Sequence, residues 1–151
     1  MTIQDTRFGE VEYSADDIIT FMPSLIGFPE SRHFLLLNSK PNTPFRWLQS
    51  LDEPKLAFLV AFTEALVPRY KPGFSRNDIE ELEITDDSPT MILATAIIPP
   101  GEPQEMTLNL AAPIIINGAT MKAKQVILSD DAYTVKHRVF ARSDRVAEKA
   151  A

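Results

Sequence analysis

The sequence predicts a mainly β domain with little helix, on three observations. Short apolar runs rich in β-branched and aromatic residues recur along the 151 residues, and such residues favour strands. Twelve prolines against five glycines stand between these runs, as expected where proline is excluded from central strands. The runs at 33–38 and 91–98 do not alternate, which predicts strands covered on both faces, as in a closed barrel or a sandwich.

The chain is expected to form a single domain over 1–151. Hydrophobic residues make up 44% and charged residues 24%, a balance far from that of disordered chains. No repeat, low-complexity tract or linker-like stretch divides the sequence. The polar segment at about 141–151 is interpreted either as a short docked helix or as a frayed tail.

Individual strands are placed by β-branched and aromatic enrichment and by apolar/polar alternation. The predicted strands are 7–13, 18–22, 33–38, 45–51, 56–62, 91–98, 105–110, 113–117, 123–128 and 133–140. One helix is predicted at 75–84, because Ser75 and Asp78 have the spacing of a capping box. Ile79 and Leu82 would then point inward.

The stretch PFRWLQSLDEPKLAFLV, residues 44–60, contains the only tryptophan and a polar residue on a predicted buried face. Trp47 lies at the centre of an alternating apolar face, and we expect it to be buried. Gln49 falls on the same face, and three roles are open for it: an active-site residue, a partner contact, or a buried amide that satisfies backbone groups at a strand end. We favour the last of these.

The formal net charge of −6 disfavours some partners and favours others. Direct nucleic-acid binding requires clustered Lys and Arg, so we predict none, and a nucleic-acid-binding barrel of the OB type is disfavoured. A basic protein is the better partner for an acidic surface.

The sequence also indicates a cellular compartment. The chain has no cysteine, which excludes disulfides and thiolate sites and suits a reducing compartment. Its first residues lack the pattern of a signal peptide, and every apolar run is shorter than the roughly 20 residues that cross a bilayer. We expect a cytoplasmic protein that does not bind membranes.

Motifs for catalysis or metal binding are absent from the sequence. His33 and His137 lack a paired-ligand spacing, and both are interpreted as surface or strand-edge residues. Neither a nucleophile elbow nor a glycine-rich phosphate loop is present. We therefore predict no catalytic residue, no metal and no cofactor. The alternative is a small β-barrel enzyme, a hydrolase or an isomerase, that uses carboxylates gathered from loops.

Two groups of polar residues are candidates for partner binding. The first is an acidic cluster, interpreted as a solvated face or as a partner-binding patch, in which the candidates are Asp78, Glu80 and Glu81. The second comprises Asn109 and Asn117, which bracket two short apolar strands. Each asparagine either closes a gap in the strand ladder or contributes to a polar rim for a docking peptide.

Several motifs, taken in order, resemble the flagellar assembly factor FliW family. They are FGEVEY, ITFMPSLIGFPE, PFRWLQSLDEPKLAFLV, YKP, TLNLAAPIIIN, and QVIL followed by a tyrosine. The segment AFTEALVPRY departs from the family pattern, since Glu64 and Pro68 replace an Asp-Pro pair, and Ser24 stands where glycine is common. The resemblance implies a small antiparallel β-barrel-like domain, which agrees with the strands predicted above.

The resemblance further implies a non-enzymatic protein that binds flagellin in the cytoplasm before export and also binds CsrA, the RNA-binding repressor of flagellin synthesis. We expect the free protein to be a monomer. The resemblance also implies that flagellin's terminal helices are amphipathic, so an apolar surface should shield them. The loop PSLIGFP offers Leu25, Ile26 and Phe28 for this purpose; the alternative is that this loop plugs the barrel.

Overall fold

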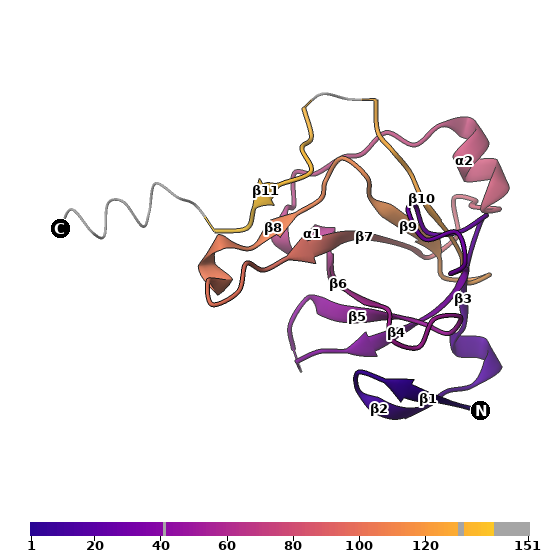
Figure 1. The fold of residues 1–151 in the computed structure, drawn as a ribbon. Helices are drawn as coiled ribbons and strands as arrows, with labels where there is room; N and C mark the ends of the chain where they lie inside the picture. Colours follow the sequence, from indigo (N-terminus) through magenta and orange to yellow (C-terminus); the bar gives the residue numbers. More distant parts are fainter. Residues whose placement is uncertain (41, 130–131, 141–151) are drawn as a thin grey trace.

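The structure, a computed structural model, describes residues 1–40, 42–129 and 132–140 (Figure 1). The predicted helix or tail at 141–151 lies outside these described residues. The strands are β1 (Thr2–Thr6), β2 (Gly9–Glu12), β3 (Ile19–Phe21), β4 (His33–Asn38), β5 (Phe45–Ser50), β6 (Ala57–Phe62), β7 (Thr90–Ile97), β8 (Thr107–Leu108), β9 (Ile114–Asn117), β10 (Lys122–Gln125) and β11 (His137–Arg138). The helices are η1 (Ala15–Asp17), α1 (Thr63–Leu66), α2 (Arg76–Glu81) and η2 (Pro103–Glu105).

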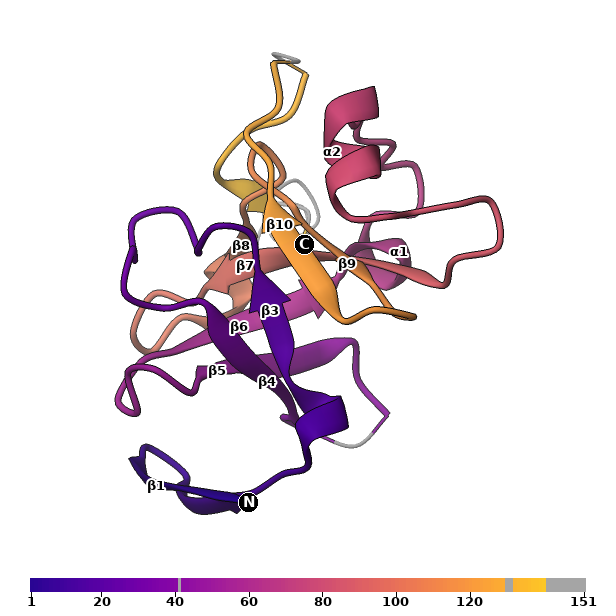
Figure 2. The same cartoon turned by 90° about the vertical axis from the view of Figure 1, so that its right-hand side faces the viewer.

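Seven of these strands close into a barrel (Figures 1 and 2). The order around the ring is β7, β6, β5, β4, β3, β10 and β9, and β9 pairs back onto β7. All neighbours in the ring are antiparallel except β3 and β10, which are parallel. The C-terminal end of β7 also pairs with β8, and β8 pairs with β11. The prediction of a mainly β, barrel-like fold is confirmed.

The barrel wall has apolar residues on both faces. Leu93 of β7 lies in the interior cluster with Phe34, Leu48 and Ile116, and all four are fully buried. The next residue, Ala94, must point to the opposite face, where it joins a second buried cluster outside the wall. This double covering explains why β7 shows a continuous apolar run instead of alternation, as the sequence predicted.

The prediction of one strand over 7–13 is wrong in its boundaries. Residues 2–12 form a separate hairpin, in which β1 pairs with β2, and residues 7 and 8 lie in the turn between them. Gly9 has a φ of +79°, a conformation that glycine adopts without steric cost. The turn therefore ends the first strand before position 7.

The helix predicted at 75–84 is confirmed as the shorter α2. Its capping box is present, with Asp78 N–H donating to Ser75 Oγ at 3.0 Å and Ser75 N–H donating to Asp78 Oδ2 at 3.4 Å. The four-residue helix α1 was not predicted, because so short a segment carries no helical periodicity. None of the helices in the described ranges is long and apolar enough to span a membrane.

The predictions for Trp47 and Gln49 have different outcomes. Leu48 fills the barrel interior, so Trp47 lies on the outer face, where it is only half-buried beneath the β1–β2 turn. The expectation of a buried Trp47 is therefore wrong. Gln49 is fully buried, and its Nε2 donates to the carbonyls of Ser50, Pro54 and Leu56 at 2.8, 2.9 and 3.2 Å. The prediction that it satisfies backbone groups at a strand end is confirmed.

Candidate partner-binding surface

The loop 23–29 divides its apolar side chains between the core and the surface. Leu25 is 2% exposed and belongs to the interior cluster, and Phe28 packs edge-on against Phe58 with ring centroids 5.0 Å apart. Ile26 is 46% exposed. A tight turn produces this division, since Phe28 N–H donates to Leu25 O at 2.9 Å across Gly27, which has a φ of +88°. Leu25 thus acts as a barrel plug, and Ile26 remains available to a partner.

The acidic helix α2 is largely paired with lysines of β10. Lys124 Nζ lies 2.6 Å from Asp78 Oδ1 and 2.8 Å from Glu81 Oε2, and Lys122 pairs with Glu83. Burial alone would raise the pKa of Asp78, but hydrogen bonds from Lys124 and Ser75 outweigh it and lower that pKa. Asp78 is buried and caps its own helix, so its observed contacts are structural.

Three other carboxylates in or near α2 are unpaired among the described residues. Glu80, Asp86 and Asp87 are exposed, and no hydrogen bond or ion pair of their side chains exists within the described residues. Glu81 is exposed but holds Lys124 and also accepts a hydrogen bond from Asn77 at 2.9 Å. Of the three acidic candidates, Glu80 is therefore the most accessible to a partner.

Both candidate asparagines hold backbone in place. Asn109 Oδ1 accepts hydrogen bonds from the N–H groups of Ala111 and Ala112, each at 3.1 Å. Asn117 is fully buried, and its Nδ2 donates to Leu82 O at 2.8 Å, which ties the segment after α2 to β9. These contacts are of the kind expected for gap-closing residues; a polar rim for a docking peptide stays a prediction.

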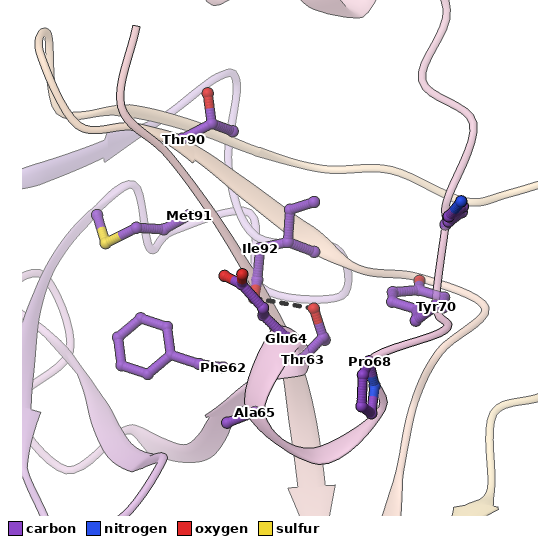
Figure 3. Close-up of a pocket in the computed structure, with 10 residues that line it drawn as sticks. Phe62, Thr63, Glu64, Ala65, Pro68, Tyr70, Thr90, Met91 and Ile92 are labelled. Carbon is purple, nitrogen blue, oxygen red and sulfur yellow. Dashed lines mark hydrogen bonds between the residues drawn. The ribbon is translucent and has the colours of Figure 1, made fainter.

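A hollow beside α1 has a volume of about 520 Å³ and a lining that is more apolar than polar. We call it the α1 hollow (Figure 3). Its lining residues are Phe62, Thr63, Glu64, Ala65, Pro68, Tyr70, Lys71, Thr90, Met91 and Ile92. The volume falls within the range of about 300 to 1,000 Å³ that is usual for ligand pockets.

Two hydrogen bonds fix the walls of the α1 hollow. Thr63 Oγ1 donates to Ile92 O at 3.3 Å, which attaches α1 to β7 (Figure 3). Tyr70 O–H donates to Leu110 O at 2.6 Å and is buried against Tyr133. Burial raises the pKa of Tyr70, so its hydroxyl stays protonated and keeps this bond.

A second hollow, of about 640 Å³, lies between η1 and the turn before β10. We call it the η1 hollow. It is lined by more polar surface, including Asp16, His33, Ala119 and Thr120. Within residues 1–40, 42–129 and 132–140, no group of three or more His, Asp or Glu side chains is placed to hold a metal ion.

Comparison with known proteins identifies the family. A family model described as FliW protein matches residues 2–139. This chain belongs to the FliW family. The flagellar assembly factor FliW of Bdellovibrio bacteriovorus is 34% identical over 152 residues, covering 100% of this chain and 86% of that protein.

Two further comparisons agree. The flagellar assembly factor FliW of Syntrophus aciditrophicus is 38% identical over 139 residues, covering 92% of this chain and 87% of that protein. A crystal structure of the flagellar assembly factor FliW has a TM-score of 0.83 at 33% identity, covering 93% of this chain and 98% of that chain. The FliW fold therefore extends over nearly the whole chain.

The enzyme alternative required several carboxylates converging in one pocket. In this FliW-family chain the α1 hollow is lined by a single carboxylate, Glu64. The carboxyls whose pKa is lowered, Asp52, Asp78 and Glu81, are each held by hydrogen bonds elsewhere. Among the described residues, the α1 hollow therefore lacks the converging carboxylates that the enzyme alternative requires.

The α1 hollow was missed at the level of sequence. Its walls come from residues 62–71 and 90–92, which are joined only when β6 and β7 pair. The one available signal was the departure from the family pattern at Glu64 and Pro68, both of which line the hollow.

Proposed function

We propose that this FliW-family protein, a monomer when free, binds flagellin in the cytoplasm before export and binds CsrA when flagellin is scarce. Membership of the FliW family over residues 2–139 carries this proposal. The protein acts by binding and has no enzymatic activity. By capturing CsrA it lifts the repression of flagellin synthesis, and by accepting flagellin it restores that repression.

The mechanism is partner exchange, which places a thermodynamic condition on the two complexes. Binding of one partner must weaken binding of the other, and the coupling factor must be the same in both directions. The two partners need not share one site. The proposal therefore requires mutual exclusion or an unfavourable coupling, and both are measurable.

A competition experiment tests the proposal. The labelled protein is titrated with the same organism's purified flagellin, with CsrA, and with CsrA in the presence of saturating flagellin. We expect each partner to bind alone and flagellin to weaken CsrA binding at least tenfold. Absence of flagellin binding, or simultaneous binding of both partners with unchanged affinity, would contradict the proposal.

We predict that Ile26→Ser weakens flagellin binding at least tenfold, because Ile26 is the exposed apolar side chain of the loop 23–29 and apolar anchors dominate such interfaces. The melting temperature should hardly change. Ile127→Ser, at an isoleucine that is 71% exposed, is the matched control and should bind normally. Equal binding by both variants would place the flagellin site elsewhere.

Phe28 is not suited to the same experiment. Its ring packs on Phe58 and against the interior cluster, so a polar substitution would destabilise the barrel. Loss of binding by a Phe28 variant would then report unfolding.

A further inference from the structure

The α1 hollow combines an apolar surface with an unpaired negative charge. Phe62, Met91 and Pro68 line it, and Glu64 projects beside Met91 and Ile92 (Figure 3). Glu64 is exposed, and its side chain has no hydrogen-bond or ion-pair partner within the described part of the chain. A carboxylate in this position gains most from a cation that reaches it across the apolar surface.

Unpaired acidic residues also lie in the segment that leads into the hollow. Asp86 and Asp87 belong to the loop between α2 and β7, and the first residues of β7, Thr90 to Ile92, line the hollow. Asp78, Glu81 and Glu83, which precede this loop and lie next to β10, are instead paired with Lys122 and Lys124. Lys71 is the one basic residue in the lining. Exposed carboxylates also occur elsewhere on the described surface, Asp16 and Glu30 among them; Glu64 differs from these because it lines the mainly apolar α1 hollow.

The shape and chemistry of the hollow fit a lysine or arginine side chain. The methylene stem of such a side chain can pack on Phe62 and Met91 while its cationic head reaches Glu64. A volume of about 520 Å³ leaves room for an apolar neighbour beside it. The walls are fixed by the Thr63 and Tyr70 hydrogen bonds, so little ordering is needed on binding.

We infer that the α1 hollow is the docking point for a Lys- or Arg-bearing segment of a basic, RNA-binding protein, with the cation placed against Glu64. The inference rests on the proposed function, in which CsrA is one of the two partners. RNA-binding proteins carry clustered Lys and Arg because they must neutralise phosphates. Flagellin is assigned to a different surface, around Ile26.

The test uses two variants of the α1 hollow and two matched controls. Glu64→Gln removes the charge at nearly constant size, and Ala65→Trp fills the hollow from an exposed position of α1. Asp16→Asn and Ala119→Trp make the same changes in the η1 hollow, where both residues are also exposed. Binding of purified CsrA and of flagellin is measured for every variant at two salt concentrations, together with the melting temperature.

We expect Ala65→Trp to weaken CsrA binding at least tenfold and Glu64→Gln to weaken it severalfold and reduce its salt dependence. Both controls should bind CsrA within twofold of the wild type, and flagellin affinity should be unchanged throughout. Because the substituted side chains are exposed, the melting temperatures should match.

Three outcomes would overturn the inference. If the wild type binds CsrA and both variants of the α1 hollow bind it equally well, the docking point lies elsewhere, although the proposed function survives. If these variants lose flagellin and keep CsrA, the hollow belongs to flagellin. If the wild type binds no CsrA at all, the CsrA arm of the proposed function fails, and the inference fails with it.

Discussion

Gln49 anchors a turn from inside the protein. Its amide donates to carbonyls on both sides of the turn between β5 and β6, while its own Oε1 is buried without a partner among the described residues. One unpaired acceptor is thus tolerated in exchange for several paired carbonyls. Buried polar groups normally find partners, and here the side chain supplies them to the backbone.

We predict that Gln49→Met lowers the free energy of unfolding by about 1 to 3 kcal/mol, the cost of leaving buried carbonyl groups without donors. Methionine keeps the length of the side chain, so the loss of packing is small. Gln4→Met, at an exposed position of β1, is the control and should be nearly neutral in urea denaturation. An equally small effect at both positions would mean that water donates hydrogen bonds to the carbonyl groups of the turn when Gln49 is absent.

Asp52 fixes the start of β4 through charge-assisted hydrogen bonds. Burial alone would raise the pKa of the Asp52 carboxyl, but the N–H groups of Arg32 and His33 donate to it at 2.7 and 2.9 Å, and with the His33 ring they lower that pKa overall. Because the pKa is lower in the folded state, the carboxylate stabilises the fold above the ordinary value of 3.8. This contribution is lost as the pH falls through the lowered value.

The corresponding prediction concerns pH. Asp52→Asn should be less stable than the wild type at pH 7, and the difference should shrink as the pH falls below about 4, where the wild-type carboxylate becomes protonated. Denaturation curves from pH 7 to pH 2.5 measure this, with Asp16→Asn as the control. A difference that stays constant over this range would show that the Asp52 charge is not involved.

The β1–β2 hairpin is the element least integrated with the barrel (Figures 1 and 2). The turn residues Arg7 and Phe8 contact Trp47, with the guanidinium 4.4 Å from the indole centroid and the two aromatic centroids 5.5 Å apart. Phe8 is still 40% exposed. The hairpin therefore covers part of the outer wall, and cation–π and aromatic packing contribute to this contact.

We predict that Trp47→Ala costs about 1 to 3 kcal/mol, less than the about 3 to 5 kcal/mol for a fully buried aromatic. Backbone amides of β1 and β2 should exchange faster while those of β4 and β5 stay protected. Leu48→Ala, which opens a cavity in the interior, is the comparison and should cost about 2 to 5 kcal/mol. Hydrogen exchange that increases throughout the barrel for Trp47→Ala would argue against this local role.

At the level of the whole molecule, ring closure joins distant parts of the chain into one core. Thr20 of β3 pairs with Lys122 of β10, about a hundred residues later, and β7 pairs with β9 to complete the ring. Residues from most of the ring meet in the interior cluster. We attribute the stability of the domain to this shared burial of apolar surface.

If packing alone stabilises the barrel, metal ions should not affect its melting temperature. We predict no change on adding EDTA or on adding Mg²⁺, Ca²⁺ or Zn²⁺ at millimolar concentration, since any ion bound to the folded state would raise the melting temperature by mass action. Differential scanning calorimetry provides the measurement. A fall of several degrees with EDTA would reveal a structural ion.

Local signals in the sequence were sufficient for many elements. β4 and β7 were predicted because their apolar runs do not alternate and are bounded by polar or proline residues. This pattern is typical of strands covered on both faces. Helix α2 was predicted because Ser75 and Asp78 cap it over four residues of chain. The strand β1 was missed because its exposed polar residues become a strand only by pairing with β2.

Which of the candidate residues are exposed was decided by the tertiary structure. Leu25 and Ile26 are adjacent and similar in chemistry. Because of the turn at Gly27, Leu25 is buried in the barrel and Ile26 is exposed to solvent. In the same way, the sequence shows the acidic run, but only the position of β10 beside α2 pairs part of it with lysines. The α1 hollow exists because β6 and β7 pair and bring 62–71 against 90–92. Local propensity acts over a few residues and so determines strands, turns and caps, whereas exposure and pairing depend on contacts between segments far apart in the chain.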